Sequence, residues 1–227
     1  CDMSRLAKVA GDFGAIIKSV LGPRRTSSGE VVGDDVTCRV MRTEVDGHEL
    51  TDEEIVSVLR NWTGGDLSSI ALCIGVILHY LATQPELQAR LRSGVSDAEM
   101  DAIIDEILRI DDPFLSNRRI TTCPVEVAGV KIPANARVKL HWTSANRDEE
   151  VFGDPDAFDP VGNAENNLVY GIGRHVCPGR LLSTVELRIA TRELLAATNS
   201  IELASQEALS REVHPVGGWA DVPVVLG

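Results

Sequence analysis

A cysteine with chemically suggestive neighbours stands in the stretch NNLVYGIGRHVCPGRLL, residues 166–182. Pro178 follows Cys177, and proline is favoured at the first position of a helix. We therefore expect Cys177 to be the N-cap residue of that helix. The unpaired N–H groups and the dipole at a helix N-terminus favour the thiolate form of a cysteine. A thiolate in this place could serve as a metal ligand.

Glycines and cationic side chains surround this cysteine. Gly171, Gly173 and Gly179 remove side chains next to it, so that a flat molecule can approach the backbone closely. Arg174 and His175 offer donors that suit carboxylates. Together these residues indicate a thiolate ligand to iron beneath a planar cofactor that carries carboxylates, which describes haem. The alternative is a buried structural cysteine after a glycine-rich turn.

Residues 170–179 resemble the haem-binding signature of the cytochrome P450 family, F-G-x-G-x-H/R-x-C-x-G. Tyr170, in place of phenylalanine, is the only departure. The resemblance implies haem b (iron protoporphyrin IX), with Cys177 as the axial ligand of its iron. It also implies that Tyr170, Gly171 and Gly179 lie against the haem, and that His175 and Arg174 lie near its carboxylates.

A second motif of the family, E-x-x-R, is matched by Glu106 and Arg109 in DAEMDAIIDEILRI, residues 97–110. A spacing of three residues puts both side chains on one face of the predicted helix. The resemblance implies a structural clamp for the loop before the cysteine. The family's third partner, an arginine or histidine after a motif like AFDP, is missing from VGNAENN at residues 161–167, so we expect the clamp to lack it.

The stretch GGDLSS, residues 64–69, stands where the family's central helix carries A-G-x-D/E-T-T. Counting back from Pro85 places Ser69 at the usual alcohol and Ser68 at the usual acid, so Asp66 is offset by two positions. The resemblance implies that Gly65 opens a kink for dioxygen and that the Ser69 hydroxyl lies near bound oxygen. Asp66 either assists from another helix position or caps a distorted turn, and Ser68 either relays protons or only packs.

Two neighbouring arginines begin the strand-like stretch RRITT, residues 118–122. Arg119 aligns with the family's strand arginine that meets a haem propionate, and Arg118 is the alternative. Because side chains alternate along a strand, only one of the two should reach the haem.

These residues need a scaffold of helices and short strands to position them. Helical periodicity, the Thr51–Glu54 capping box and the breaks at glycine and proline predict five helical segments. Alternating apolar runs predict short strands, and residues 151–167 form a loop. The fold class is therefore mainly α with small β-sheets (α+β), the C-terminal part of the P450 fold, in a single domain over residues 1–227. The predicted helices are residues 3–21, 54–62, 62–83, 97–110 and 178–198, and the predicted strands are residues 118–122, 125–129, 130–132 and 136–140.

Composition narrows the class of protein. The net charge of −12 argues against nucleic acid or an anionic membrane as the main partner. The sequence contains no run of about 18 apolar residues, so we expect no membrane anchor. Five cysteines with wide spacing predict neither a disulfide framework nor a zinc site, which favours a reducing cytoplasm. Apart from Cys177 they are interpreted as small buried hydrophobic residues: Cys1, Cys38, Cys73 and Cys123.

The resemblance implies a monooxygenase that uses O2 and two electrons to oxidise a small organic substrate. No flavin or iron–sulfur signature is present, so the electrons would come from a ferredoxin- or flavodoxin-type donor or a fused reductase. Arg174, Arg180, Arg188 and Arg192 either form a docking surface for an acidic donor or belong to a solvated helix face. Because the family's chains are much longer, the alternative function is a non-catalytic haem-binding fragment or one half of a split P450, inactive without an N-terminal half.

Overall fold

The computed structural model describes residues 3–205, 208–214 and 216–227. The chain divides into two compact units, Cys1–Leu67 and Ser68–Gly227, and each is described by itself. The single domain expected from the sequence stays a prediction.

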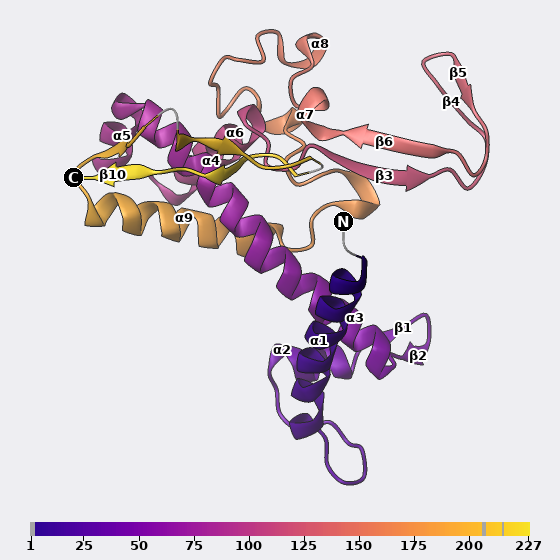
Figure 1. Ribbon diagram of the computed structural model, residues 1–227. Coiled ribbons are helices and arrows are strands. Elements are labelled where there is room, and N and C mark those ends of the chain that lie inside the picture. Colours follow the sequence, from indigo (N-terminus) through magenta and orange to yellow (C-terminus); the bar gives the residue numbers. More distant parts are fainter. Residues whose placement is uncertain (1–2, 206–207, 215) are drawn as a thin grey trace. The chain divides into compact units, whose positions relative to one another are not determined.

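The first unit is built on two helices that pack side by side, α1 (Met3–Leu21) and α3 (Asp52–Gly64) (Figure 1). Between them lie the short helix α2 (Val36–Met41) and the hairpin of β1 (Glu44–Val45) and β2 (His48–Glu49). Leu21, Met41 and Ile55 form the small core of this unit. The predicted helix over residues 3–21 is confirmed.

The capping box at the start of α3 is also confirmed. The Thr51 hydroxyl accepts a hydrogen bond from the Glu54 N–H at 3.3 Å, and the Glu54 carboxylate accepts one from the Thr51 N–H at 2.8 Å. Two backbone N–H groups at the helix start are thereby satisfied, which explains why α3 begins at Asp52.

The helix is distorted next to the two glycines, where the resemblance implied a kink at Gly65. Gly65–Ser69 forms a π-helical turn between α3 and α4 (Ile70–Thr83). Glycine weakens an α-helix because its backbone has more freedom to lose, so a pair of glycines is a favourable place for an irregular turn. The whole stretch Asp52–Thr83 is long and apolar enough to cross a membrane by length and composition alone, a test that core helices of soluble proteins also meet. The absence of a membrane anchor stays a prediction.

The second unit is centred on three helices whose apolar sides meet: α4, α6 (Asp97–Ile110) and α9 (Arg180–Ala197) (Figure 1). The helix α5 (Pro85–Arg92) packs against α4 and α9. In α4 the segment from residue 70 to 81 is largely covered, as its apolar composition predicted, and only Ala71 of it is exposed. Buried residues from all four helices form the core: Cys73, Val76, Ile77, Leu81, Leu91, Met100, Ile103, Ile104, Ile107, Leu108, Leu187 and Leu195.

Short antiparallel strand pairs surround these helices. β3 (Ser116–Ile120) pairs with β6 (Arg137–His141), and the hairpin of β4 (Val125–Val127) and β5 (Val130–Ile132) lies between them in the chain. β7 (Ile201–Leu203) pairs with β10 (Val224–Leu226), and β8 (Ser210–Arg211) with β9 (Trp219–Asp221). The α+β class is confirmed.

Several boundaries differ from the sequence prediction. β3 begins and ends two residues earlier than predicted and β6 one residue later, because the paired register, not the local run of residues, sets strand ends. The predicted loop over residues 151–167 contains the end of α8 (Glu149–Phe152) and a 3₁₀ turn at Ala164–Asn166. α7 (Trp142–Ala145) was not predicted.

Two of the four cysteines that were interpreted as small buried residues are buried in the structure. Cys38 and Cys73 are buried and reduced, but Cys123 is exposed, because it lies in the bend between β3 and β4. Cys1 lies outside the described residues.

Candidate functional site

Residues 167–179, called the cysteine loop below, present Cys177 through a tight set of backbone hydrogen bonds. The Gly171 N–H donates to the Leu168 carbonyl and the Cys177 N–H to the Tyr170 carbonyl, both at 2.8 Å. Gly171 and Gly173 have φ angles of 72° and 70°, in the region that L side chains rarely adopt. These two glycines are therefore required by the path of the backbone, in addition to leaving space.

The predicted N-cap position of Cys177 is wrong. α9 begins at Arg180, and its N-cap residue is Gly179. Pro178 and Gly179 form a turn closed by a hydrogen bond from the Arg180 N–H to the Cys177 carbonyl at 3.3 Å. Gly179 has φ −84° and ψ 1°, which is not helical, so the helix starts after it. Cys177 thus lies two residues before the N-cap.

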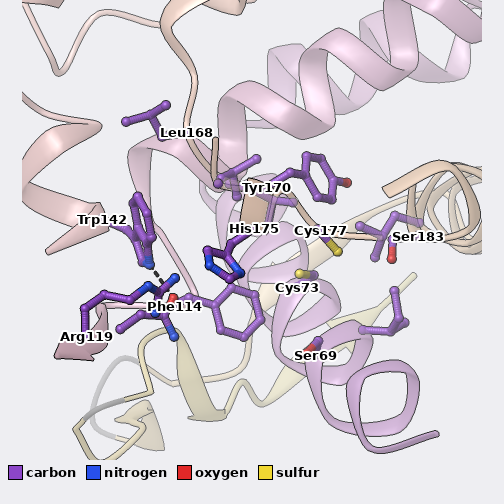
Figure 2. A pocket seen from close by; sticks show the side chains of 16 residues that line it. Ser69, Cys73, Phe114, Arg119, Trp142, Leu168, Tyr170, His175, Cys177 and Ser183 are labelled. Atoms are coloured by element: carbon purple, nitrogen blue, oxygen red, sulfur yellow. Dashed lines mark hydrogen bonds between the residues drawn. The ribbon is translucent and has the colours of Figure 1, made fainter. Parts of the chain in front are cut away.

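Cys177 lines a cavity together with residues from distant parts of the second unit (Figure 2). Tyr170, Gly171 and His175 come from the cysteine loop, Arg119 from β3, and Ser69 from the helical segment that leads into α4. His175 belongs to a 3₁₀ turn, Gly173–His175. The structure thus brings the sulfur and the imidazole of the cysteine loop and the guanidinium of β3 to one cavity.

The two strand arginines separate as the alternation along β3 predicted. Arg119 lines the cavity of Cys177, whereas Arg118 lines only a neighbouring surface hollow. Asn117, two residues before Arg119, shares its face and lines the same cavity.

Trp142 is a cavity residue that sequence reasoning missed. Its indole N–H donates a 2.6 Å hydrogen bond to the Asn117 side chain, and it lies in the cavity wall near Arg119 (Figure 2). Nothing in the spacing of Trp142 points to a site, because it follows β6 in sequence and reaches β3 only through the β3–β6 pairing.

Only some of the other predicted site residues lie at the cavity of Cys177. Ser69 lines the cavity, but Ser68 and Arg174 are not among its lining residues. Gly179 lies near the cysteine, since a Cβ built on it would be 3.8 Å from the Cys177 sulfur, an ordinary contact. Gly65 and Asp66 belong to the first unit, where both are part of the π-helical turn.

The predicted clamp exists as a buried ion pair. Glu106 and Arg109 are joined by two parallel hydrogen bonds of 2.7 and 2.9 Å, with side chains 2% and 0% exposed. The remaining guanidinium N–H groups donate to the main-chain carbonyls of Asn146, Pro155 and Ala157. A buried pair is stabilising only when its other hydrogen bonds are also made, and here they are.

The clamp has a third partner, but this partner is an asparagine and not the family's arginine or histidine. The Asn163 amide donates to the Glu106 carboxylate at 2.8 Å, and the Asp159 N–H donates to the same oxygen at 3.0 Å. A neutral amide thus serves as the third partner, a role for which the resemblance implied an arginine or histidine. No spacing rule identifies an asparagine in this role, because the amide reaches Glu106 only through the path of the loop.

Asn146 connects the clamp to the cysteine loop. Its carbonyl accepts from Arg109 at 2.8 Å, and its side-chain oxygen accepts from the Leu168 N–H at 2.7 Å. Its side-chain amide donates to Asp112, and burial raises the pKa of Asp112 to about 7. Asn146 is fully buried, so the beginning of the cysteine loop is held by a buried network.

Cys73 lies in the same cavity as Cys177, one helical turn after Ser69. Burial raises the pKa of the Cys73 thiol to about 12, and nearby negative groups, including Asp112, add to this. Cys73 is therefore a neutral thiol at physiological pH, and Cys177 is the better candidate for a metal ligand.

Two of the α9 arginines considered for docking are paired with acidic residues of the same unit, while the Arg180 side chain is 57% exposed, and the docking surface stays a prediction. Arg188 and Arg192 are paired with Asp97 and Asp101 of α6, with closest distances of 2.5 Å. Arg180 lies 3.9 Å from Asp105. These arginines join α9 to α6 through ion pairs that were not predicted from the sequence.

The residues present fit a planar cofactor with carboxylates. The Cys177 side chain lines the same cavity as His175, Arg119 and Asn117, whose ring, guanidinium and amide N–H groups are donors of the kind that carboxylates need. The cavity measures about 200 Å³, which is below the roughly 300–1,000 Å³ usual for a ligand site.

Comparisons with known proteins agree with this geometry. The family model described as "Cytochrome P450" matches residues 33–201. The erythromycin C-12 hydroxylase of Saccharopolyspora erythraea is 33% identical over 98% of this chain, and the methyl-branched lipid omega-hydroxylase of Mycobacterium tuberculosis is 32% identical over 95%. The ligand-free structure of cytochrome P450 TbtJ1 superimposes over 100% of this chain with a TM-score of 0.88 and 30% identity.

The chain spans about half the length of these relatives. It covers 55% of the erythromycin hydroxylase, 50% of the lipid hydroxylase and 60% of the TbtJ1 chain.

Proposed function

The chain belongs to the cytochrome P450 family, and on that premise we propose that it forms the thiolate-bearing part of a haem monooxygenase. The proposed holoprotein oxidises a small organic substrate with O2 and two electrons. The observation that carries the proposal is the convergence of Cys177 and His175, from the cysteine loop, with Arg119, from β3, on one cavity.

Cys177 is the proposed axial ligand of haem b. Haem, when bound, supplies the iron that activates dioxygen for insertion into a substrate. The cysteine loop holds the sulfur in place through the Cys177 N–H to Tyr170 carbonyl hydrogen bond. Gly171 and Gly179 keep the backbone bare near the sulfur, so that the ring can approach.

His175, Arg119 and Arg174 are the proposed contacts of the haem carboxylates. Arg119 and His175 face the cavity, while Arg174 would have to act from its edge. A guanidinium and an imidazole donate charge-assisted hydrogen bonds to carboxylates, which orients the ring and offsets its negative charge in an acidic chain.

The Ser69 hydroxyl is the proposed group that holds a proton near the reacting oxygen. It is the one member of the GGDLSS stretch among the residues that line the cavity. Ser68 is the proposed neighbour of Ser69 in the second unit, whereas the roles of Asp66 and Gly65, which belong to the first unit, stay predictions.

The proposed partners are a small organic substrate and a ferredoxin- or flavodoxin-type donor, or a fused reductase. Two relatives are named as an erythromycin C-12 hydroxylase and a methyl-branched lipid omega-hydroxylase, which supports an organic substrate. Free cysteines at Cys38, Cys73, Cys123 and Cys177 support a reducing, cytoplasmic location.

The test is incorporation of labelled oxygen. The chain, extended at its N-terminus to the length of its relatives, would be supplied with a ferredoxin and its reductase, 18O2 and a panel of organic substrates that includes erythromycin and methyl-branched lipids. We expect one 18O atom per product molecule, and no labelled product from the Cys177→Ala variant. Product formation that is unchanged in Cys177→Ala would contradict the proposal.

A second function remains for the 227-residue chain itself, a haem-binding part that is inactive alone. The size of the cavity favours it, because the cavity is smaller than a usual ligand site. Haem binding without labelled product from the 227-residue chain, beside turnover by the extended chain, would establish it.

A further inference from the structure

Two buried polar atoms near the cysteine loop have no hydrogen-bond partner among the described residues. They are the Tyr170 hydroxyl and one carboxylate oxygen, Oδ1, of Asp105 on α6. A buried polar atom without a partner is costly, so native structures rarely leave a donor and an acceptor unpaired side by side. One is a donor and the other an acceptor.

Both residues line one small cavity of about 70 Å³, together with Arg180. The Arg180 guanidinium lies 3.9 Å from the other oxygen of Asp105 and 5.2 Å from the centre of the Tyr170 ring. The cavity leaves the two side chains room to approach one another, and it could also admit a water molecule that bridges them.

Asp105 already holds the cysteine loop through its main chain. The Asn167 side-chain amide donates to the Asp105 carbonyl at 2.8 Å. Tyr170 in turn accepts the Cys177 N–H on its own carbonyl, also at 2.8 Å. Tyr170 is therefore the residue through which a contact with Asp105 reaches Cys177.

We propose that Asp105 is a positioning residue for Cys177, because its carboxylate accepts a hydrogen bond from the Tyr170 hydroxyl and so fixes the cysteine loop on α6. The inference rests on the proposed function only in treating Cys177 as the iron ligand. It gives a purpose to the one departure from the family signature, since phenylalanine at position 170 would have no hydroxyl to donate.

The charges around Asp105 support a hydrogen bond that depends on pH. Burial raises the pKa of Asp105 to about 6, against the opposing effects of Arg180 and the Tyr170 hydroxyl. Burial also raises the pKa of Tyr170, so the phenol keeps its proton. The groups that face or adjoin Asp105 are Asp101 and Glu106 on α6, Tyr170 on the cysteine loop, Arg180 on α9 and Cys73 on α4.

The test measures how fast iodoacetamide labels Cys177 in the haem-free 227-residue chain, with the labelled peptide read by mass spectrometry. Well above pH 6, Tyr170→Phe and Asp105→Asn should each speed labelling about three- to tenfold, the range expected for one hydrogen bond. The double variant should be no faster than either single variant, because both remove the same contact.

Two matched controls are available in the chain. Tyr80 is its only other tyrosine, and Asp101 lies one turn before Asp105 on α6 and is paired with Arg188. Tyr80→Phe and Asp101→Asn should leave the labelling rate of Cys177 unchanged.

A stability measurement separates positioning from simple support of the fold. Because the pKa of Asp105 is raised from 3.8 to about 6 in the folded protein, its ionisation lowers stability as pH rises through that interval. Asp105→Asn should therefore raise the free energy of unfolding above pH 6 and yet speed the labelling of Cys177. A purely structural role would instead lower the free energy of unfolding while the labelling of Cys177 becomes faster.

The pH dependence gives a further check. The ratio of the Asp105→Asn rate to the wild-type rate should shrink below pH 6, where the wild-type carboxyl loses its charge and the hydrogen bond weakens.

Three results would overturn the proposal: additive effects of the two substitutions, no change in labelling, or stability and protection falling together. The Tyr170 hydroxyl also lies close to Thr184 on α9. If Tyr170→Phe were coupled to Thr184→Val and not to Asp105→Asn, Thr184 would be the partner and the proposal would be wrong. Because the labelling uses haem-free chain, a failure to bind haem would contradict the proposed function and leave this result standing.

Discussion

The Glu106 clamp and the π-helical turn at Gly65–Ser69 were both predicted from short motifs, but they are built in opposite ways. Glu106 and Arg109 are almost completely buried, and each has several hydrogen-bond partners. In the π-helical turn, Leu67 is 70% exposed and none of the five residues is buried. Hydrogen bonds and burial within one unit therefore fix the positions of the clamp residues. The residues of the π-helical turn are held by much less packing.

Breaking the clamp should have the largest effect. Arg109→Ala leaves the buried Glu106 carboxylate without its counter-charge, which costs about 3–5 kcal/mol. Urea unfolding followed by circular dichroism would measure the loss, and Glu106→Gln offers a milder variant if Arg109→Ala does not fold.

The matched control for the clamp is the exposed pair of Arg90 and Glu99, whose side chains are 58% and 38% exposed. Arg90→Gln should cost at most about 1 kcal/mol. Equal losses for Arg109→Ala and Arg90→Gln would show that burial does not set the strength of the clamp.

Asn163 should contribute the next largest effect. Asn163→Ala removes the amide that satisfies the Glu106 carboxylate, and an unpaired buried acceptor costs about 1–3 kcal/mol. Asn163→Asp should cost more, because it places a second carboxylate against Glu106. Asn166→Ala, at an exposed position in the same loop, is the control. If Asn163→Asp were the milder substitution, the third-partner role would be wrong.

Asp112 should make the stability of the clamp network depend on pH. Burial raises its pKa from 3.8 to about 7 in the folded protein, so the folded state holds a proton that the unfolded state releases. Its contribution to stability is present below about pH 4 and is lost as pH rises to about 7. Asp112→Asn should flatten this part of the pH–stability curve while keeping an oxygen for the Phe114 N–H. An unchanged slope would place the titration elsewhere.

The π-helical turn should tolerate substitution. A Cβ on Gly65 would meet nothing within 4 Å, and Gly65 has ordinary helical angles, φ −62° and ψ −48°. Gly65→Ala should therefore stabilise the chain by about 0.5–1 kcal/mol through the lower backbone entropy of alanine in the unfolded state. Destabilisation would mean that the turn is more tightly determined than its exposure indicates.

The sequence predicted what depends on local pattern. Helix periodicity, the Thr51 capping box and the strand alternation that separates Arg118 from Arg119 each need only neighbouring residues, and each is found in the structure. The start of α9 was missed by two residues, because Pro178 is compatible with a turn as well as with a first helical turn.

Long-range partners were beyond sequence reasoning. Asn146, Asn163 and Trp142 act through segments brought together by the fold, and asparagine and tryptophan carry no spacing signal for such roles. The pairing of the α9 arginines with α6 was likewise invisible, because Arg188 and Asp101 are 87 residues apart.

The most direct test of the account is the carbon monoxide difference spectrum of the dithionite-reduced, haem-reconstituted chain, with Cys177→Ala measured alongside. We predict a strongly red-shifted Soret band, the signature of a thiolate bound to haem iron, which is absent from Cys177→Ala. A red-shifted band that persists in Cys177→Ala, or haem that binds to both proteins without it, would contradict Cys177 as the axial ligand.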